Sequence, residues 1–108
     1  MAMPSRLQVP ARAKRGETIE IRIAIQHPME NGQRRDESGR TVPYNTLEEM
    51  FCRYAGDEVF RLYLSSGIAA NPLLAFHLVA TRSGEIELAW VDTVGQSGRA
   101  SARITVDD

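Results

Sequence analysis

The sequence contains one cysteine, Cys52, so the chain cannot form an internal disulfide. It has no apolar run near the roughly 20 residues that a membrane-spanning helix needs. An excess of positive charge is also lacking, because the formal net charge is −1 and provides no field to attract nucleic acid or an anionic membrane surface. These absences argue against a membrane-spanning protein and against nucleic acid as a partner.

Patterns that mark catalytic and metal sites are absent as well. The two histidines, His27 and His77, lie 50 residues apart without a companion at metal-ligand spacing. No nucleophile elbow, phosphate-binding loop, dinucleotide fingerprint or calcium-binding loop is present. We expect His77 to lie on the surface and His27 to act as a hydrogen-bonding anchor. We predict no catalytic residue, no metal and no cofactor.

Cys52 is the only side chain besides the hydroxyls that could act as a nucleophile. On a strand it would share a face with Met50 and Tyr54, which predicts a small buried hydrophobe and not a reactive thiol. A disulfide to another chain is the alternative that the sequence leaves open.

Hydrophobic and polar residues alternate along much of the sequence. With 108 residues, 43% of them hydrophobic, the chain is long enough for one domain, which we expect to span residues 1–108. The clearest strand pattern is residues 17–26, in which four β-branched residues fall on one face. These are Ile19, Ile21, Ile23 and Ile25.

The same period of two residues marks four later segments, residues 59–65, 73–81, 85–92 and 99–106. A short edge strand near Leu7 and Val9 would bring the count to about seven, and residues 95–98 are expected to form a turn. This pattern, without a long helical segment, predicts an all-β fold, an immunoglobulin-like β-sandwich with no internal disulfide.

Residues 46–55 fit two structures. Leu47, Met50 and Tyr54 occur at helical spacing. Alternatively, every second residue lies on one face of a strand that turns at Gly56 into the next strand. A strand would complete a sheet, whereas a lone helix would still need a surface to cover, so we favour the strand.

Residues 27–43 form the longest irregular stretch, with two prolines and several charged residues. A loop longer than about 12 residues in a compact domain is usually functional or disordered. The run His27-Pro28-Met29-Glu30-Asn31-Gly32, followed by Val42-Pro43, resembles the HPMExG signature of the SoxZ family, the Z subunits of a thiosulfate-oxidation carrier complex. Further matches follow in order along the chain: Gly16-Glu17, Gly56, Ala70-Asn71-Pro72, Ser83-Gly84 and Trp90-Val91-Asp92. Asn31 departs from the more usual Thr in the signature.

The resemblance implies a non-catalytic β-sandwich that forms a heterodimer with SoxY. In that complex, a cysteine near the C-terminus of SoxY, in a glycine-rich segment, carries the sulfur intermediate to the pathway enzymes, which are transient clients. Cys52 has no glycine flanks, so we assign it no carrier role. Residues 1–15 lack the apolar region of a secretory signal, which by itself predicts a cytoplasmic chain. The resemblance instead implies a periplasmic protein, exported already folded with SoxY.

Candidate residues for the partner interface come from two regions. Tyr63 and Val79 fall on the outward faces of their expected strands, where an apolar interface would need them. The long loop contributes a second set: His27, Met29, Glu30, Gly32 and Arg34. A chain expressed alone is expected to form a homodimer through the same face. A stand-alone immunoglobulin-like binding module is the alternative function, and a hydrolase that uses a histidine is a distant third.

Overall fold

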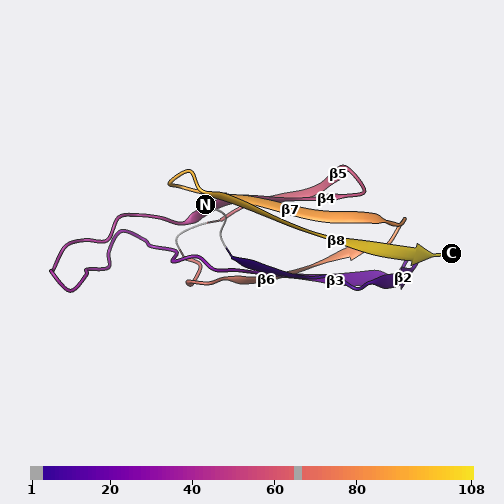
Figure 1. Cartoon of the computed structure of the whole chain (residues 1–108), viewed down its shortest axis with the longest axis horizontal. Helices are drawn as coiled ribbons and strands as arrows, with labels where there is room; N and C mark the ends of the chain where they lie inside the picture. The colour runs from indigo at the N-terminus through magenta and orange to yellow at the C-terminus, as the bar shows by residue number, and fades with distance from the viewer. Residues whose placement is uncertain (1–3, 65–66) are drawn as a thin grey trace.

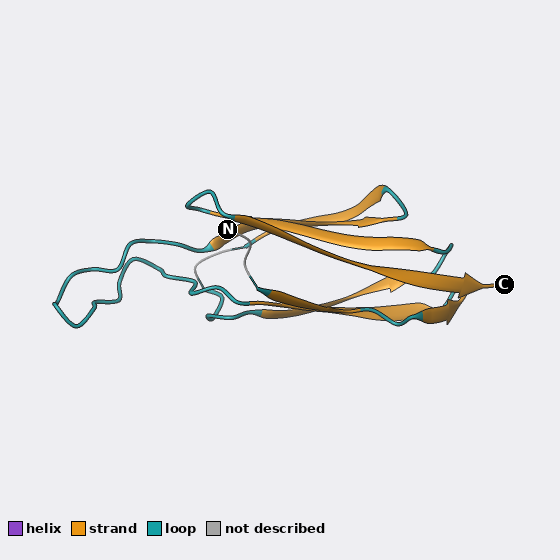
Figure 2. Cartoon of the chain, viewed as in Figure 1, coloured by secondary structure: helices purple, strands orange, loops and turns teal. Residues whose placement is uncertain are grey.

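The computed structural model describes residues 4–64 and 67–108 of the chain. Figure 1 shows two layers of strands stacked face to face, with a long loop projecting from one end of the stack. All regular structure in the described residues is β-strand (Figure 2). The predicted all-β sandwich is therefore confirmed.

The first layer is a three-stranded antiparallel sheet with β3 at its centre. Its order is β1 (Ser5–Gln8), β3 (Thr18–Ile25) and β6 (Leu73–Val79). The second layer has five strands, of which β2 pairs in parallel with β8 and the others pair antiparallel. Its order is β2 (Arg12–Lys14), β8 (Ser97–Asp107), β7 (Gly84–Asp92), β4 (Leu47–Tyr54) and β5 (Asp57–Tyr63).

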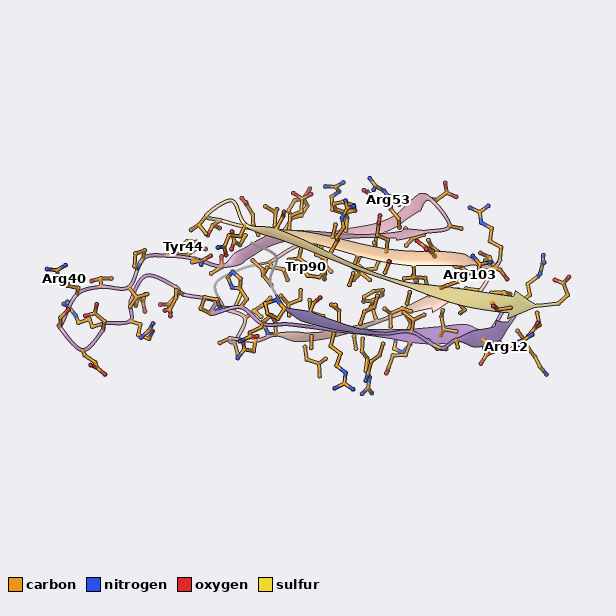
Figure 3. All side chains as sticks on the ribbon, in the orientation of Figure 1. Arg12, Arg40, Tyr44, Arg53, Trp90 and Arg103 are labelled. Atoms are coloured by element: carbon orange, nitrogen blue, oxygen red, sulfur yellow. The ribbon has the colours of Figure 1, made fainter. Side chains whose placement is uncertain are left out.

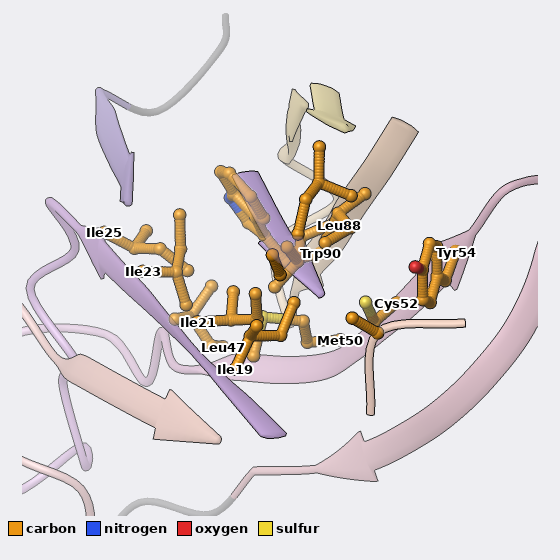
Figure 4. Close-up of a cluster of buried hydrophobic side chains, with 14 of the residues drawn as sticks. Ile19, Ile21, Ile23, Ile25, Leu47, Met50, Cys52, Tyr54, Leu88 and Trp90 are labelled. Atoms are coloured by element: carbon orange, nitrogen blue, oxygen red, sulfur yellow. The ribbon is translucent and has the colours of Figure 1, made fainter. Parts of the chain in front are cut away.

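The core lies between the two sheets and follows from the alternation in the sequence. The four isoleucines of β3 are buried and face the inner side chains of the five-stranded sheet (Figure 4). Burial of each such aliphatic side chain contributes roughly 1.5–3 kcal/mol. The rings of Phe60 and Phe76 meet edge to face with centroids 4.4 Å apart, and so connect β5 of one sheet to β6 of the other. The opposing inner residues are Met50, Cys52, Ile86, Leu88, Trp90 and Ile104.

Most predicted strands are present. Residues 46–55 form strand β4, as favoured, and the helical alternative is wrong. Ala55 and Gly56 both have positive φ, 50° and 91°, as a two-residue turn between antiparallel strands requires. The described residues form eight strands rather than about seven, because the short strand β2 carries no alternation signal. Of the segment predicted at 59–65, residue Ser65 lies outside the described residues.

The turn expected at residues 95–98 lies two residues earlier, at residues 93–96, because β7 ends at Asp92 and β8 already begins at Ser97. Gly98 is therefore a strand residue. A Cβ at this position would lie 2.6 Å from Nε1 of Trp90, so glycine is needed here for the close approach of the indole ring and not for a turn.

The long loop between β3 and β4 forms an arm, which we define as residues 31–44. The protein is 60 Å long and 19 Å across in the other two directions. Its longest strand has 11 residues and spans about 36 Å at roughly 3.3 Å per residue. The arm accounts for most of the remaining length (Figure 1).

Candidate partner interface

A buried pair of polar side chains lies where the arm leaves the sandwich. Nε2 of His27 is 3.1 Å from Oδ2 of Asp92, and the two side chains are 1% and 0% exposed. The other carboxylate oxygen of Asp92 accepts hydrogen bonds from the backbone N–H groups of Val94 and Gln96. The polar atoms of both side chains therefore have partners, as burial requires.

The hydrogen bonds of His27 indicate its tautomer. Its Nδ1 lies 3.0 Å from the backbone nitrogen of Met29, which donates to it. Because a protonated Nδ1 could not accept this bond, the imidazole proton is assigned to Nε2, which donates to Asp92. The arrangement is a neutral imidazole that connects the start of the arm to the end of β7, and it agrees with the predicted anchoring role.

Two further residues hold the start of the arm in place. The backbone N–H of His27 donates to Oδ1 of Asn71, and the backbone N–H of Asn71 donates to the carbonyl of His27. The backbone N–H of Leu47 donates to the sulfur of Met29 at 3.3 Å. Met29 and Asn71 both have positive φ, 49° and 53°, a conformation that costs about 1–3 kcal/mol and persists where surrounding bonds enforce it. The signature residues thus set the direction of the arm.

The arm itself is a narrow antiparallel ribbon. Glu30 and Asn45 exchange both backbone hydrogen bonds at its base, and Arg35 bridges Thr41 near its tip. Nε and Nη2 of Arg34 donate to the carboxylate of Glu30, and this bonding lowers the pKa of Glu30 below its ordinary value. No residue of the arm is buried.

The seven interface candidates occupy different environments. His27 and Met29 are buried in the isolated chain, so their side chains present little surface to a partner. Met29, Glu30 and Arg34 come together around one hollow of about 470 Å3 at the base of the arm. Gly32, with φ of 82°, lies half-buried beside Tyr44.

Tyr63 and Val79 are exposed, 73% and 52%, as predicted for outward positions. They do not share a face, however. Tyr63 pairs with Glu49 on the outside of the five-stranded sheet, whereas Val79 pairs with Thr18 on the outside of the three-stranded sheet. One flat interface therefore cannot cover both residues. Among residues 4–64 and 67–108, the other exposed large hydrophobic residues are Tyr44, Val59, Leu73 and Val94.

Sequence reasoning missed a group of side chains on the outside of the five-stranded sheet. Phe51 is half-buried there, with the guanidinium carbons of Arg53 and Arg61 at 4.9 and 5.0 Å from its ring centroid. Arg61 also pairs with Glu49 and with Glu58. Cross-strand neighbours cannot be identified before the strand register is known, so the sequence gives no signal for this group.

Cys52 is buried in the core, and desolvation raises the pKa of its thiol to about 11. The thiolate is the reactive form, so a cysteine with this pKa is unreactive near neutral pH. The prediction of a small buried hydrophobe is confirmed. His77 lies on the surface, as expected, with its imidazole 3.5 Å from the carboxylate of Glu20.

Within residues 4–64 and 67–108, no three side chains of the His, Cys, Asp or Glu type come close enough to hold a metal ion. The same residues include no helix long and apolar enough to cross a membrane.

Comparisons with known proteins give one family and one fold. The family model of the sulphur oxidation protein SoxZ matches residues 7–103. No curated protein matches the chain in sequence. Similar folds occur in the superoxide reductase (neelaredoxin) from Ignicoccus hospitalis, with a TM-score of 0.69 and 14% identity over 95% of this chain and 79% of that chain. The sulfur carrier protein SoxY from Chlorobium limicola f. thiosulfatophilum has a TM-score of 0.62 and 11% identity over 96% of this chain and 79% of that chain. These identities are low, so the structural similarities show the fold alone.

Proposed function

The chain belongs to the SoxZ family of sulphur oxidation proteins, and we propose from this premise that it is the non-catalytic subunit of a carrier complex with SoxY. In this complex SoxY holds the sulfur intermediate on its own cysteine, and the present chain binds and supports SoxY. The observation that carries the proposal is the family match, which covers nearly the whole sequence, residues 7–103.

The chemistry of the chain supports this division of roles. A carrier thiol must be exposed and able to form a thiolate, because it exchanges its cargo with several enzymes. Cys52 is fully buried in β4, and the pKa of its thiol is raised to about 11. The carrier cysteine therefore belongs on another chain.

The fold also suits a supporting role. The core joins both sheets, and the buried pair His27–Asp92 fixes the start of the arm. A rigid body of this kind can present loops and faces to partners without moving itself. The pathway enzymes are proposed as transient clients of the complex, and export to the periplasm as a folded heterodimer with SoxY is proposed as its route.

Co-expression with the SoxY of the same organism tests the proposal. With an affinity tag on SoxY only, the chain should co-purify in equal amounts and elute as a heterodimer in size-exclusion chromatography. The chain alone should form monomers or homodimers and should not consume thiosulfate. Recovery of SoxY without the chain would contradict the proposal and favour a stand-alone binding module.

Localisation has its own test. When SoxY retains its export signal, the chain should appear in the periplasmic fraction, and when that signal is deleted, the chain should stay in the cytoplasm. Export that does not depend on SoxY would contradict the proposed route.

A further inference from the structure

We infer that SoxY docks on the outer face of the five-stranded sheet, centred on Phe51, and not on the outer face of the three-stranded sheet. We call this surface the Phe51 face and define it by the outward residues of β4, β5, β7 and β8. The inference rests on the proposed function, since it names the surface that SoxY uses. The outward residues at its centre are Glu49, Phe51, Arg61, Tyr63, Ala89, Val91, Ser97 and Arg99.

The strand register places four of these side chains in one row across the sheet. Arg61 of β5 is opposite Phe51 of β4, Phe51 is opposite Ala89 of β7, and Ala89 is opposite Arg99 of β8. The next row toward the arm carries Tyr63 on β5, the most exposed large hydrophobic residue in the part of the chain that the structure describes. Tyrosine, arginine and phenylalanine are the residue types enriched in protein interfaces.

This row of side chains contains a hollow because Ala89 is much smaller than its neighbours. Ala89 lies between the ring of Phe51 and the side chain of Arg99, and the hollow of about 490 Å3 around it is also lined by Val91 and Ser97. Figure 3 shows that Arg53, next to this group, points away from the body, whereas Trp90 points between the sheets. A side chain of a partner can therefore enter the hollow without displacing the core.

The sizes of the two outer faces favour the five-stranded sheet as the docking surface for SoxY. Five strands about 4.8 Å apart and roughly 26 Å long cover about 600 Å2. The three-stranded sheet, in which β1 has only four residues, covers about 300 Å2 by the same measure. A stable interface takes about 800 Å2 from each partner. The five-stranded sheet therefore offers a partner about twice the footprint of the three-stranded sheet.

Each outer face carries an arginine for which the described part of the structure shows no ion pair. On the three-stranded sheet this residue is Arg6 of β1, while Glu20 pairs with Arg22. On the Phe51 face, Arg99 has no carboxylate within ion-pair distance among the described residues. The docking surface of SoxY should therefore place a carboxylate against Arg99 and an apolar side chain over Ala89.

Two matched pairs of variants test which of the two outer faces binds SoxY. Ala89→Gln fills the hollow on the Phe51 face, and Ala75→Gln places the same side chain on the three-stranded sheet. Tyr63→Asp and Val79→Asp introduce a charge at an exposed apolar position of each face. Each variant is co-expressed with wild-type chain and a limiting amount of tagged SoxY. The ratio of the two chains in the eluate is then measured by intact mass.

We expect Ala89→Gln and Tyr63→Asp to be at least about tenfold depleted from the SoxY complex, while Ala75→Gln and Val79→Asp stay within about twofold of wild type. A charge reversal gives a third pair, in which Arg99→Glu is depleted and Arg6→Glu is not. Thermal melting of each purified variant confirms that it folds.

The outcomes distinguish the inference from the proposed function. If the wild-type chain does not co-purify with SoxY, the proposed function fails. If the wild type co-purifies but the depleted variants are Ala75→Gln and Val79→Asp, SoxY docks on the other sheet and the inference is overturned. Retention of all folded variants with a bound wild type overturns it as well.

Discussion

His27 and Asp92 lie 65 residues apart in the sequence and meet inside the protein, where the imidazole Nε2 is 3.1 Å from a carboxylate oxygen. His27 begins the signature run that leads into the arm, and Asp92 ends β7. The pair therefore joins the arm to the five-stranded sheet. The signature histidine is buried and holds the start of the arm in position.

Replacement of His27 by alanine should lower the stability of the protein substantially. The variant leaves the buried carboxylate of Asp92 without its imidazole partner and the N–H of Met29 without its acceptor. Leaving a buried hydrogen-bonding group without its partner costs about 1–3 kcal/mol, and more when the group is charged. The total stability of such a domain is roughly 5–15 kcal/mol. Urea denaturation followed by tryptophan fluorescence measures the loss.

The other histidine provides the control. His77→Ala removes an exposed imidazole beside Glu20 and should change the free energy of unfolding by less than about 0.5 kcal/mol. If both histidine variants were equally stable, the buried pair would not anchor the arm.

Much of the fold could be predicted because strand alternation is a local property. The isoleucines of β3 and the inner residues of β7 are buried, as their period of two residues predicts. The role of Asp92 could not be predicted, because nothing near it in the sequence indicates a contact with His27. Similarly, the sequence marks Tyr63 and Val79 as outward but cannot tell one outer face of a sandwich from the other.

The thiol of Cys52 should resist alkylation in the folded protein. Burial raises its pKa from an ordinary 9.0 to about 11, so the thiolate fraction at pH 8 is about a hundredfold lower than in the unfolded chain. Iodoacetamide at pH 8, followed by intact mass, should modify the protein rapidly in concentrated urea and very slowly without it. Rapid modification of the folded protein would contradict the buried position.

The raised pKa of the Cys52 thiol also predicts that the stability of the protein depends on pH in the alkaline range. Because the pKa of the folded state is raised, the contribution of the thiol is fully present below pH 9 and is lost as the pH rises toward 11. The difference in free energy of unfolding between the wild type and Cys52→Ala should therefore be constant from pH 6 to pH 8 and become smaller above pH 9. A constant difference up to pH 11 would disagree with this pKa.

The arm should be dispensable for folding. None of its residues is buried, so replacement of residues 33–42 by Gly-Gly removes no core contact. A loop of about half the length costs roughly 0.6 kcal/mol less to close. We expect the melting temperature to stay the same or to rise by a few degrees, as measured by circular dichroism. A large fall in the melting temperature would mean that the arm stabilises the body. A separate measurement, turnover by the reconstituted pathway with this variant, tests whether the arm contacts the client enzymes.

The close approach of Gly98 and Trp90 gives a prediction with an internal control. Gly98→Ala places a methyl group within 2.7 Å of three atoms of the indole ring, which must shift or strain the core. Overpacking of this kind costs about 1–3 kcal/mol. Ser101→Ala, on the outward side of the same strand, should change the free energy of unfolding by less than about 0.5 kcal/mol.

A double-mutant cycle identifies the cause of that loss. The three contacted atoms, Nε1, Cε2 and Cζ2, all lie beyond the Cδ atoms of Trp90, and leucine has no atoms at these positions. Trp90→Leu should itself be destabilising, because it leaves a cavity in the core. In the Trp90→Leu background, however, Gly98→Ala should cost at least 1 kcal/mol less than in the wild type, since the added methyl group then occupies free space. Equal costs in the two backgrounds, measured by urea denaturation and circular dichroism, would show that Gly98 is required by the backbone and not by the ring.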